Sequence, residues 1–493
     1  MYLLLVLCLL AGCGSERPVD VVEMGVEAPI WPDYAGVTIP VGIAPMNFNY
    51  DGEEDIAMMH VAVRGSQGGE MEAMGEWADF DSKQWRQLAE QNRGGILTFT
   101  VSVKCKADGQ WVGYEPFDMQ ISDEPLTDWG VTYRKIAPGF ETFSKIGIYQ
   151  RCLADFAETP ILEETTVDGQ CLNCHYANRA NPAQYSLHVR GKHGGTLIHT
   201  EDGNKYLHTK TDQTVGNCTY GYWHPGGRYC AYSLNRIYQN FYVGKERLIE
   251  PWDAVSDIVV LDTRDNTLLT LPSLMTDDCE TTPAFSADGN TLYFCRAPKV
   301  NMPGEYQELK YSLCAIPFDS NTGQYGDSIY TVISADSIGQ SVSLPRPSYD
   351  GRYLMYCLTD YGTNPVDRPE ADLWLMDLQS GQTRPIDEVN SDQVDGYHNW
   401  SSQGGWFLFS SKREDTLYAH VYISRIGQDG IATKPFLLPQ RNPKKYYGES
   451  LHSFNAPDFT SEPVALSLRE ARSLIIDQSP IHVTIKEDGN SNP

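Results

Sequence analysis

The chain has 493 residues, of which 65 are acidic and 38 basic, and its formal net charge at pH 7 is −27. This balance excludes a general role in nucleic-acid binding, because such proteins present basic patches to phosphate groups. Hydrophobic residues make up 41% and charged residues 21% of the chain, as in ordinary globular proteins, and Tyr dominates the aromatic residues with 29 copies. Tyr favours half-buried strands, so the composition indicates a mainly β protein, and the length suggests about three domains.

The first thirteen residues predict a secreted lipoprotein. Met1 begins an apolar stretch that is too short to span a bilayer and that ends in Leu10-Ala11-Gly12-Cys13. This ending resembles the bacterial lipobox, although no Lys or Arg precedes the apolar stretch. The resemblance implies lipidation at Cys13 and a membrane anchor. Gly14 stands where an inner-membrane retention signal often carries Asp, so the implied address is the outer membrane of a bacterial cell envelope.

Patterns along the chain predict a β-sandwich followed by a short helical segment. Leu97, Phe99, Val101 and Val103 alternate with polar residues, which is typical of a strand with one buried face. The spacing also predicts a short helix over 82–90 and an amphipathic helix over 140–158. We expect a signal peptide over 1–13, a tether over 14–38, the β-sandwich-like domain over 39–125, and a helical segment with a Cys-x-x-Cys-His motif over 126–194.

The remaining chain contains a repeat that predicts a β-propeller over 195–462, followed by a tail over 463–493. An aromatic residue or Pro, a turn ending in Gly and an apolar strand recur around Gly227, Gly289, Gly351 and Gly404, with spacings of 62, 62 and 53 residues. The turn needs Gly because its backbone takes a positive φ. A further unit is expected to be split, with outer strands over 196–200 and 205–209 and an inner strand over 454–458. We expect five or six blades, and a large sandwich or open sheet is the alternative.

This repeat resembles the TolB-like, WD-repeat-like propellers, in which the turn Ser-x-Asp-Gly-x-x-Leu-x-Phe recurs. The resemblance covers about half of the chain and implies the propeller fold.

The motif that carries chemistry is Cys171-Leu-Asn-Cys174-His175. This spacing is the attachment signature of c-type haem, with both thiols bound to the porphyrin and His175 as the proximal iron ligand. His188 is our choice for the sixth ligand, and His193, His199 or a Met are alternatives. Two His ligands would favour electron transfer, because no open position remains on the iron.

Two other interpretations of the motif stay open. Cys171, Cys174, His188 and His193 also satisfy the spacing of a Cys2His2 zinc site. The two cysteines could instead form a disulfide or redox pair, or lie in a segment without a cofactor. The other cysteines carry a similar ambiguity, since the pairs Cys218 with Cys230 and Cys279 with Cys295 fit either disulfides or buried free thiols.

The layout of the whole chain resembles a group of lipoproteins of the Bacteroidetes type, which combine a sandwich, a Cys-x-x-Cys-His segment and a TolB-like propeller. The resemblance rests on the stretches 31–48, 133–140, 148–151 and 190–196. It implies architecture and haem, but no reaction.

Other functional signals are weak. No Gly-x-Ser-x-Gly motif, P-loop or dinucleotide fingerprint is present, so a hydrolase is not expected. Asp350, Asp360 and Asp367 are candidate calcium ligands, but solvated turn residues are the favoured interpretation. Three residues near inner strands are candidate metal ligands, although structural histidines are favoured: His224, His398 and His452.

Two functions follow as hypotheses. The first is a membrane-anchored electron-transfer protein that binds haem c, without an assigned catalytic residue. The second is a non-enzymatic lipoprotein whose propeller face binds a protein or glycan, with zinc, a disulfide or no cofactor at Cys171 and Cys174. A third and weaker option is an enzyme that is similar to nitrite reductases, in which a haem domain precedes a propeller.

Overall fold

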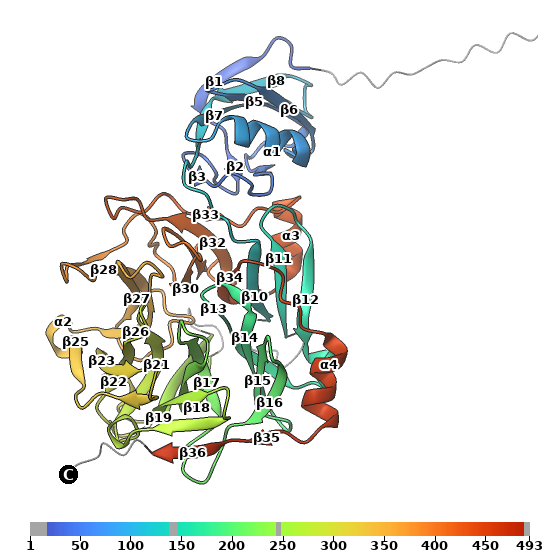
Figure 1. Ribbon diagram of the computed structural model, residues 1–493. Coiled ribbons are helices and arrows are strands. Elements are labelled where there is room, and N and C mark those ends of the chain that lie inside the picture. The colour runs from blue at the N-terminus through green and yellow to red at the C-terminus, as the bar shows by residue number, and fades with distance from the viewer. Residues whose placement is uncertain (1–16, 138–145, 243–247, 488–493) are drawn as a thin grey trace, which may run out of the picture.

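The protein is built mostly from β-strands (Figure 1), and the computed structural model describes residues 17–137, 146–242 and 248–487. An N-terminal domain precedes a propeller-like ring of sheets that begins near residue 130 and ends near residue 460. The predicted mainly β fold and the propeller-like arrangement are confirmed. In the described part of the chain, no helix has the length and apolar character needed to cross a membrane.

The N-terminal domain contains one seven-stranded sheet. Its strands are β1 (Val22–Glu27), β3 (Thr38–Ile39), β5 (Ile56–Gly65), β6 (Glu70–Gly75), β7 (Ile96–Cys105), β8 (Trp111–Glu115) and β9 (Phe117–Ile121). A two-stranded ribbon, β2 (Ile30–Trp31) with β4 (Asn49–Tyr50), lies beside it. The seven strands of the main sheet all hydrogen-bond into one layer, so the predicted β-sandwich is not confirmed. Strand β1 lies in the segment that we expected to be a tether.

Helix α1 (Ser82–Gln91) lies against β5 and β6 and agrees with the helix predicted from the sequence. The side chain of Asp81 caps it by accepting hydrogen bonds from the backbone N–H groups of Lys83 and Gln84. Trp85 and Leu88 are buried on one face of the helix, as its spacing predicts.

Four sheets of the ring stand as separate blades. One contains β10 (Gly130–Ile136), β11 (Gly147–Cys152), β12 (Glu158–Glu163) and β34 (Ser453–Thr460). The next contains β13 (Cys171–Asn178), β14 (Asn181–Arg190), β15 (Gly195–Thr200), β16 (Gly203–His208) and β35 (Ile481–His482). The third contains β26 (Ser341–Pro347), β27 (Tyr353–Thr359), β28 (Asp372–Asp377) and β29 (Thr383–Pro385). The fourth contains β30 (Asp395–Trp400), β31 (Trp406–Ser411), β32 (His420–Arg425) and β33 (Phe436–Leu437).

The remaining strands of the ring form a single ten-stranded sheet. They are β17 (Cys218–Trp223), β18 (Tyr229–Phe241), β19 (Ile249–Asp262), β20 (Thr267–Thr270), β21 (Cys279–Phe285), β22 (Thr291–Ala297), β23 (Ser312–Asp319), β24 (Gln324–Tyr325), β25 (Tyr330–Ile333) and β36 (Thr484–Glu487). Pairing between Ser256 of β19 and Cys279 of β21 joins the repeat units around Gly227 and Gly289. The prediction of five or six separate blades is therefore wrong. Four separate blades and one double-width sheet make up the ring.

The ring is closed by a strand from the end of the chain. Strand β34 pairs antiparallel with β10, with Gly130 opposite Thr460 and Ile136 opposite Ser453. We expected residues 454–458 to form the inner strand that closes the ring. We also expected its outer strands to be 196–200 and 205–209. Those residues form β15 and β16, which belong to the sheet of β13 and β14.

The prediction of a helical segment around the Cys-x-x-Cys-His motif is wrong. Residues 147–152 and 158–163 form β11 and β12, and the motif begins β13. The first residues of the predicted helix, 140–145, lie outside the described residues. Strand pairing on both sides of β11 overrides the helical spacing, because it lets Ile148 and the fully buried Arg151 reach partners in neighbouring elements.

The repeat turns have the backbone predicted for them. The φ angles of Gly227, Gly289, Gly351 and Gly404 lie between 73° and 76°. Each turn connects the inner strand of a repeat unit to its second strand.

The segment after the ring lies along the outer edges of two neighbouring sheets. Helix α4 (Leu468–Arg472) continues into a π-helical turn, Ser473–Asp477. Strand β35 then pairs parallel with β16, and β36 pairs parallel with β20. The tail therefore covers two strand edges that would otherwise be open to other chains.

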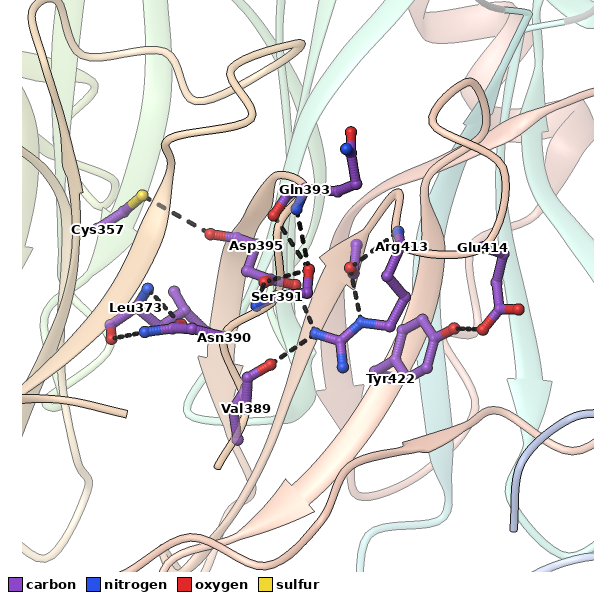
Figure 2. Close-up of polar contacts among 11 residues, drawn as sticks. Cys357, Leu373, Val389, Asn390, Ser391, Gln393, Asp395, Arg413, Glu414 and Tyr422 are labelled. Atoms are coloured by element: carbon purple, nitrogen blue, oxygen red, sulfur yellow. Dashed lines mark hydrogen bonds and ion pairs between the residues drawn. The ribbon is translucent and has the colours of Figure 1, made fainter. Parts of the chain in front are cut away.

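The connection between β29 and β30 is fixed by a fully buried carboxylate, that of Asp395 (Figure 2). One of its oxygens accepts a hydrogen bond from Arg413 at 2.6 Å, and the other accepts from Ser391 N at 2.7 Å. Arg413 also donates to the carbonyl oxygen of Val389 at 2.6 Å. One ion pair thus ties a blade to the loop that leads into it.

The N-terminal domain packs against the ring near helix α3 (Pro443–Ser450). The Tyr34 hydroxyl donates to the carbonyl oxygen of Leu437 at 3.0 Å. Asn47 and Trp77 donate to the carbonyl oxygen of Arg441 at 2.9 and 3.0 Å. Buried side chains of both parts form one continuous hydrophobic cluster.

Candidate ligand-binding cavity in the ring

A β-bulge in each inner strand decides which side chains face the centre of the ring. At every bulge the pairing register shifts, and one residue other than Gly has a positive φ. The six residues are Cys174, Tyr220, Thr282, Leu344, Tyr397 and Ala456. Four of them, Cys174, Tyr220, Tyr397 and Ala456, line a common cavity.

This cavity has a volume of about 440 Å³, which lies in the range of small-molecule sites. Cys171 and Cys174 of β13 form part of its wall. An arm made by the far ends of β18 and β19 forms another part, through Ile237, Phe241 and Ile249. The cavity lies at the end of the ring where β13 begins and where β18 ends.

The charged side chains of the cavity are mostly cationic. Arg134, Arg190 and Lys192 line it, and none of the three forms an ion pair among the described residues. Lys412 also lines it, and its ammonium group pairs with Asp367. A protein with a net charge of −27 thus concentrates unpaired positive charge in one concave site, which attracts anions.

Neutral donors and apolar surface complete the wall. Burial raises the pKa of Tyr220 and Tyr397, so both phenols stay protonated at neutral pH. The Tyr397 hydroxyl donates to Asn364 Oδ1 at 3.2 Å. Together with Tyr176, these rings favour a ligand that carries an anionic group on an organic body.

The two thiols of the motif are not bridged to each other, and both line this cavity. Arg134 Nη2 donates to Cys171 Sγ at 3.8 Å, and burial raises the pKa of the Cys174 thiol. Three residues along a strand span about 10 Å, whereas a disulfide needs Cα atoms within about 7 Å. The strand therefore disfavours a disulfide between Cys171 and Cys174.

The histidines expected as iron or zinc ligands do not line the cavity. His175 is fully buried, burial lowers its pKa to about 3, and neither ring nitrogen has a partner among the described residues. His188 lies on β14 opposite Asn173, and burial lowers its pKa to about 3 as well. His193 lies in the turn after β14 and His199 lies on β15; both are partly exposed, and the His199 ring contacts the Asn204 side chain.

No group of three or more His, Cys, Asp or Glu side chains suited to a metal ion occurs within the described residues. Haem c needs an imidazole beside both thiols, and a Cys2His2 zinc site needs two. The described side chains do not fit either group in this arrangement. Both assignments stay predictions from the motif.

The weaker metal candidates are also kept apart. His224 lies in a turn, where its Nδ1 accepts a hydrogen bond from Gly226 N at 2.9 Å, and His398 is buried in β30. Asp350 accepts from Ser348 and from the backbone of Arg352, as a turn residue does. Asp360 and His452 join no group of potential ligands within the described ranges.

All ten described cysteines are unbridged, and eight of them are buried. Cys218 pairs with Leu234 and Cys230 with Trp223, so the two thiols are not direct cross-strand neighbours. Cys279 and Cys295 are offset in the same way. The structure thus has buried free thiols at these positions rather than disulfides.

Sequence reasoning missed the cationic and phenolic side chains of the cavity. Arg134 lies within β10 and Arg190 at the end of β14, so they stand on either side of the motif and far from one another in the chain. Tyr220 and Tyr397 stand at bulges, which leave no clear pattern in a single sequence. Only the two cysteines were found, through the spacing of the motif.

Comparison with known proteins identifies no family. No family model matches the chain, and no curated protein sequence matches it. An oligogalacturonate lyase in complex with manganese is 12% identical, with a TM-score of 0.34, over 62% of this chain and 74% of that one. Prolyl oligopeptidase B from Galerina marginata is 10% identical, with a TM-score of 0.36, over 63% of this chain and 45% of that one.

A puromycin-hydrolyzing peptidase of Mycobacterium tuberculosis is 12% identical, with a TM-score of 0.34, over 70% of this chain and 52% of that one. This chain therefore spans about half the length of the two peptidases. Similarities at this level do not bear on its function.

Proposed function

We propose that this protein is a lipid-anchored binding protein of the bacterial cell envelope whose ring holds an anionic organic ligand in the cavity. The observation that carries the binding part is the presence of unpaired Arg134 and Arg190 at one cavity in a strongly acidic chain. The sequence ending at Cys13 supports the anchor and the outer-membrane address.

The proposed ligand carries a carboxylate or a similar planar anion. A guanidinium group can donate two parallel hydrogen bonds to such a group. Protonated phenols at Tyr220 and Tyr397 add neutral donors, and the apolar face of the β18–β19 arm suits the ligand body. Two arginines beside two aromatic hydroxyls would orient the anion toward the start of β13.

Access to the cavity is proposed from one end of the ring. At the other end, the Arg179 side chain donates to the carbonyl oxygens of Ala287 and Tyr349, in the turns after β21 and β26. Its guanidinium lies 5.2 Å from the centre of the Tyr349 ring. The Arg179 side chain thus bridges two turns at that end of the ring, which supports a cavity that opens at one end only.

Alkylation of the cavity thiols tests the proposal without knowledge of the natural ligand. Iodoacetate is anionic and iodoacetamide neutral, so their relative rates at one thiol report the local potential. We expect the ratio of the iodoacetate rate to the iodoacetamide rate to be severalfold higher at Cys171 than at Cys105. Cys105 is a partly exposed thiol near Asp108 and Glu54.

The variant Arg190→Gln should lower this preference at Cys171 and leave Cys105 unchanged. Added salt should lower it as well, through screening. Equal preferences at the two thiols in the unmodified protein would contradict the proposed anion site.

Haem-dependent electron transfer is the second candidate function. It is favoured by the fact that both thiols of the Cys-x-x-Cys-His motif line one cavity. It requires His175 to leave its buried position. Protein produced with a haem-c maturation system should then show a porphyrin absorption band that Cys171→Ala removes. A colourless protein in which both thiols react with alkylating reagents would contradict haem binding, and only the binding function would remain.

A further inference from the structure

Four aromatic rings form a row that runs from the interior to the surface beside the β18–β19 arm. Tyr238 and Trp252 face each other across the two strands, with ring centres 6.0 Å apart and planes 28° apart. Trp252 stacks on Tyr306 in the same way at 5.3 Å and 28°. Tyr306 meets the edge of Tyr361 at 5.7 Å.

The inner end of the row is firmly held. The Glu250 carboxylate is 3% exposed and accepts hydrogen bonds from the hydroxyl groups of Tyr306, at 2.9 Å, and Tyr361. The Arg368 guanidinium lies 3.9 Å from the centre of the Tyr361 ring. These contacts fix the rings before any ligand binds, so a stacking partner would lose little from ordering them.

The outer end of the row is open to solvent. The side chain of Tyr238 is 53% exposed, although most large aromatic residues of this protein are buried. Trp252 is nine-tenths buried, and its Nε1 has no hydrogen-bond partner among the described residues. Alternation along β18 turns Ile237 and Gln239 toward the cavity, so Tyr238 lies on the other face of the arm.

We propose that the exposed ring of Tyr238 is a stacking platform for a neutral sugar ring of a glycan. The C–H groups of a pyranose carry partial positive charge and complement the negative face of an aromatic ring. The net charge of −27 disfavours an anionic ligand on this open surface, so the platform suits a neutral sugar. A single ring face is far smaller than the roughly 800 Å² per partner of a stable protein interface.

This site is independent of the anion site proposed above. Electrophoresis through native gels that contain a neutral polysaccharide tests it, with galactomannan, xyloglucan and dextran as the probes. We expect at least one of them to retard the protein. Tyr238→Ala should weaken this retardation at least tenfold in apparent Kd, whereas Tyr238→Phe should keep it within about twofold.

Tyr330→Ala is the matched control, because Tyr330 is 48% exposed on β25. This variant and Arg190→Gln should be retarded as strongly as the unmodified protein. The proposal is overturned if none of the three polysaccharides retards the protein, or if Tyr238→Ala is retarded equally. It is also overturned if Tyr238→Ala weakens the binding of a protein partner but not the binding of any polysaccharide.

Discussion

Cys174 lines the cavity, whereas His175, the next residue along β13, is fully buried outside it. On a helix, the spacing Cys-x-x-Cys-His places all three side chains toward one cofactor. On a strand with a bulge at Cys174, the thiols share one face, and the imidazole lies near Tyr185 of β14. The local backbone, rather than the motif itself, therefore separates thiol chemistry from imidazole chemistry here.

Replacement of His175 by Leu should change stability little. The ring is neutral, because burial lowers its pKa to about 3, and among the described residues only the backbone of Thr132 offers it a weak polar contact. An apolar side chain of similar volume leaves no polar atom unsatisfied, so we expect a change below about 1.5 kcal/mol in the free energy of unfolding. Denaturant unfolding at pH 7 measures it.

Arg151→Leu is the control for His175→Leu. The Arg151 guanidinium is buried and donates to the carbonyl oxygens of Asp155 and Pro439 at 3.0 and 2.5 Å. Its loss should cost about 3 kcal/mol or more, because carbonyl groups are left without donors. Equal effects of the two variants would show that His175 has a partner that matters.

Asp458→Asn should remove part of the pH dependence of stability. The Asp458 carboxyl accepts from Ala177 N at 3.0 Å and from Asn399 Nδ2 at 2.6 Å, and burial raises its pKa to about 7. Arg346 opposes this shift and Asp128 adds to it.

The folded protein therefore binds a proton at Asp458 that the unfolded chain, with an ordinary Asp pKa, releases near pH 4. Its contribution to stability is present below pH 4 and is lost as the pH rises to about 7. From pH 4.5 to 7.5, the unmodified protein should lose a few kcal/mol relative to Asp458→Asn. The exposed Asp202→Asn serves as the control, and a parallel pH profile for all three proteins would refute the assignment.

Gly289→Ala should destabilise the protein more than Gly381→Ala does. Both residues have φ near +75°, at 76° and 73°, so the backbone cost of about 1 kcal/mol is shared. A methyl group at Gly289 would collide with the buried His224 ring, whereas one at Gly381 meets no atom within 4 Å. We expect an additional loss of about 1–2 kcal/mol at Gly289, measured by denaturant unfolding. Equal losses would mean that His224 moves aside freely.

Removal of residues 479–493 should expose strand edges without opening the ring. This deletion takes away β35 and β36 but keeps β34, which pairs with β10. Amide exchange should become faster in β16 and β20, and the protein should aggregate more readily. Unchanged exchange in these two strands would show that the tail does not protect them.

Much of the fold could be predicted from patterns that are local in the chain. The alternation at Leu97 to Val103, the helix with Trp85 and the turns at Gly289 and Gly351 each depend on neighbouring residues, and the structure contains all of them. The partner of β34 could not be predicted, because pairing between residues more than 300 positions apart leaves no local signal. The helix expected at Ile148 failed for a different reason, since pairing with the adjacent strands β10 and β12 overrides the helical spacing.

The candidate site was predictable only in its cysteines. Bulges rotate Tyr220 and Tyr397 into the cavity, and a single sequence does not mark a bulge. The two arginines come together only when the sheet of β10 packs beside the sheet of β13 and β14. The repeat spacing suggested too many separate blades, because the bridge between Ser256 and Cys279 merges two units into one sheet.

The pairing of β34 with β10 has a consequence for the order of assembly. The sheet of β10, β11 and β12 receives its inner strand only after residue 460 has been synthesised, although its other strands end at residue 163. Until then, Val131 and Tyr133 lie on a strand with one open edge. Closure of the ring is therefore a late step that depends on a long-range contact. A truncated or stalled chain would expose an unpaired strand edge that is prone to aggregation.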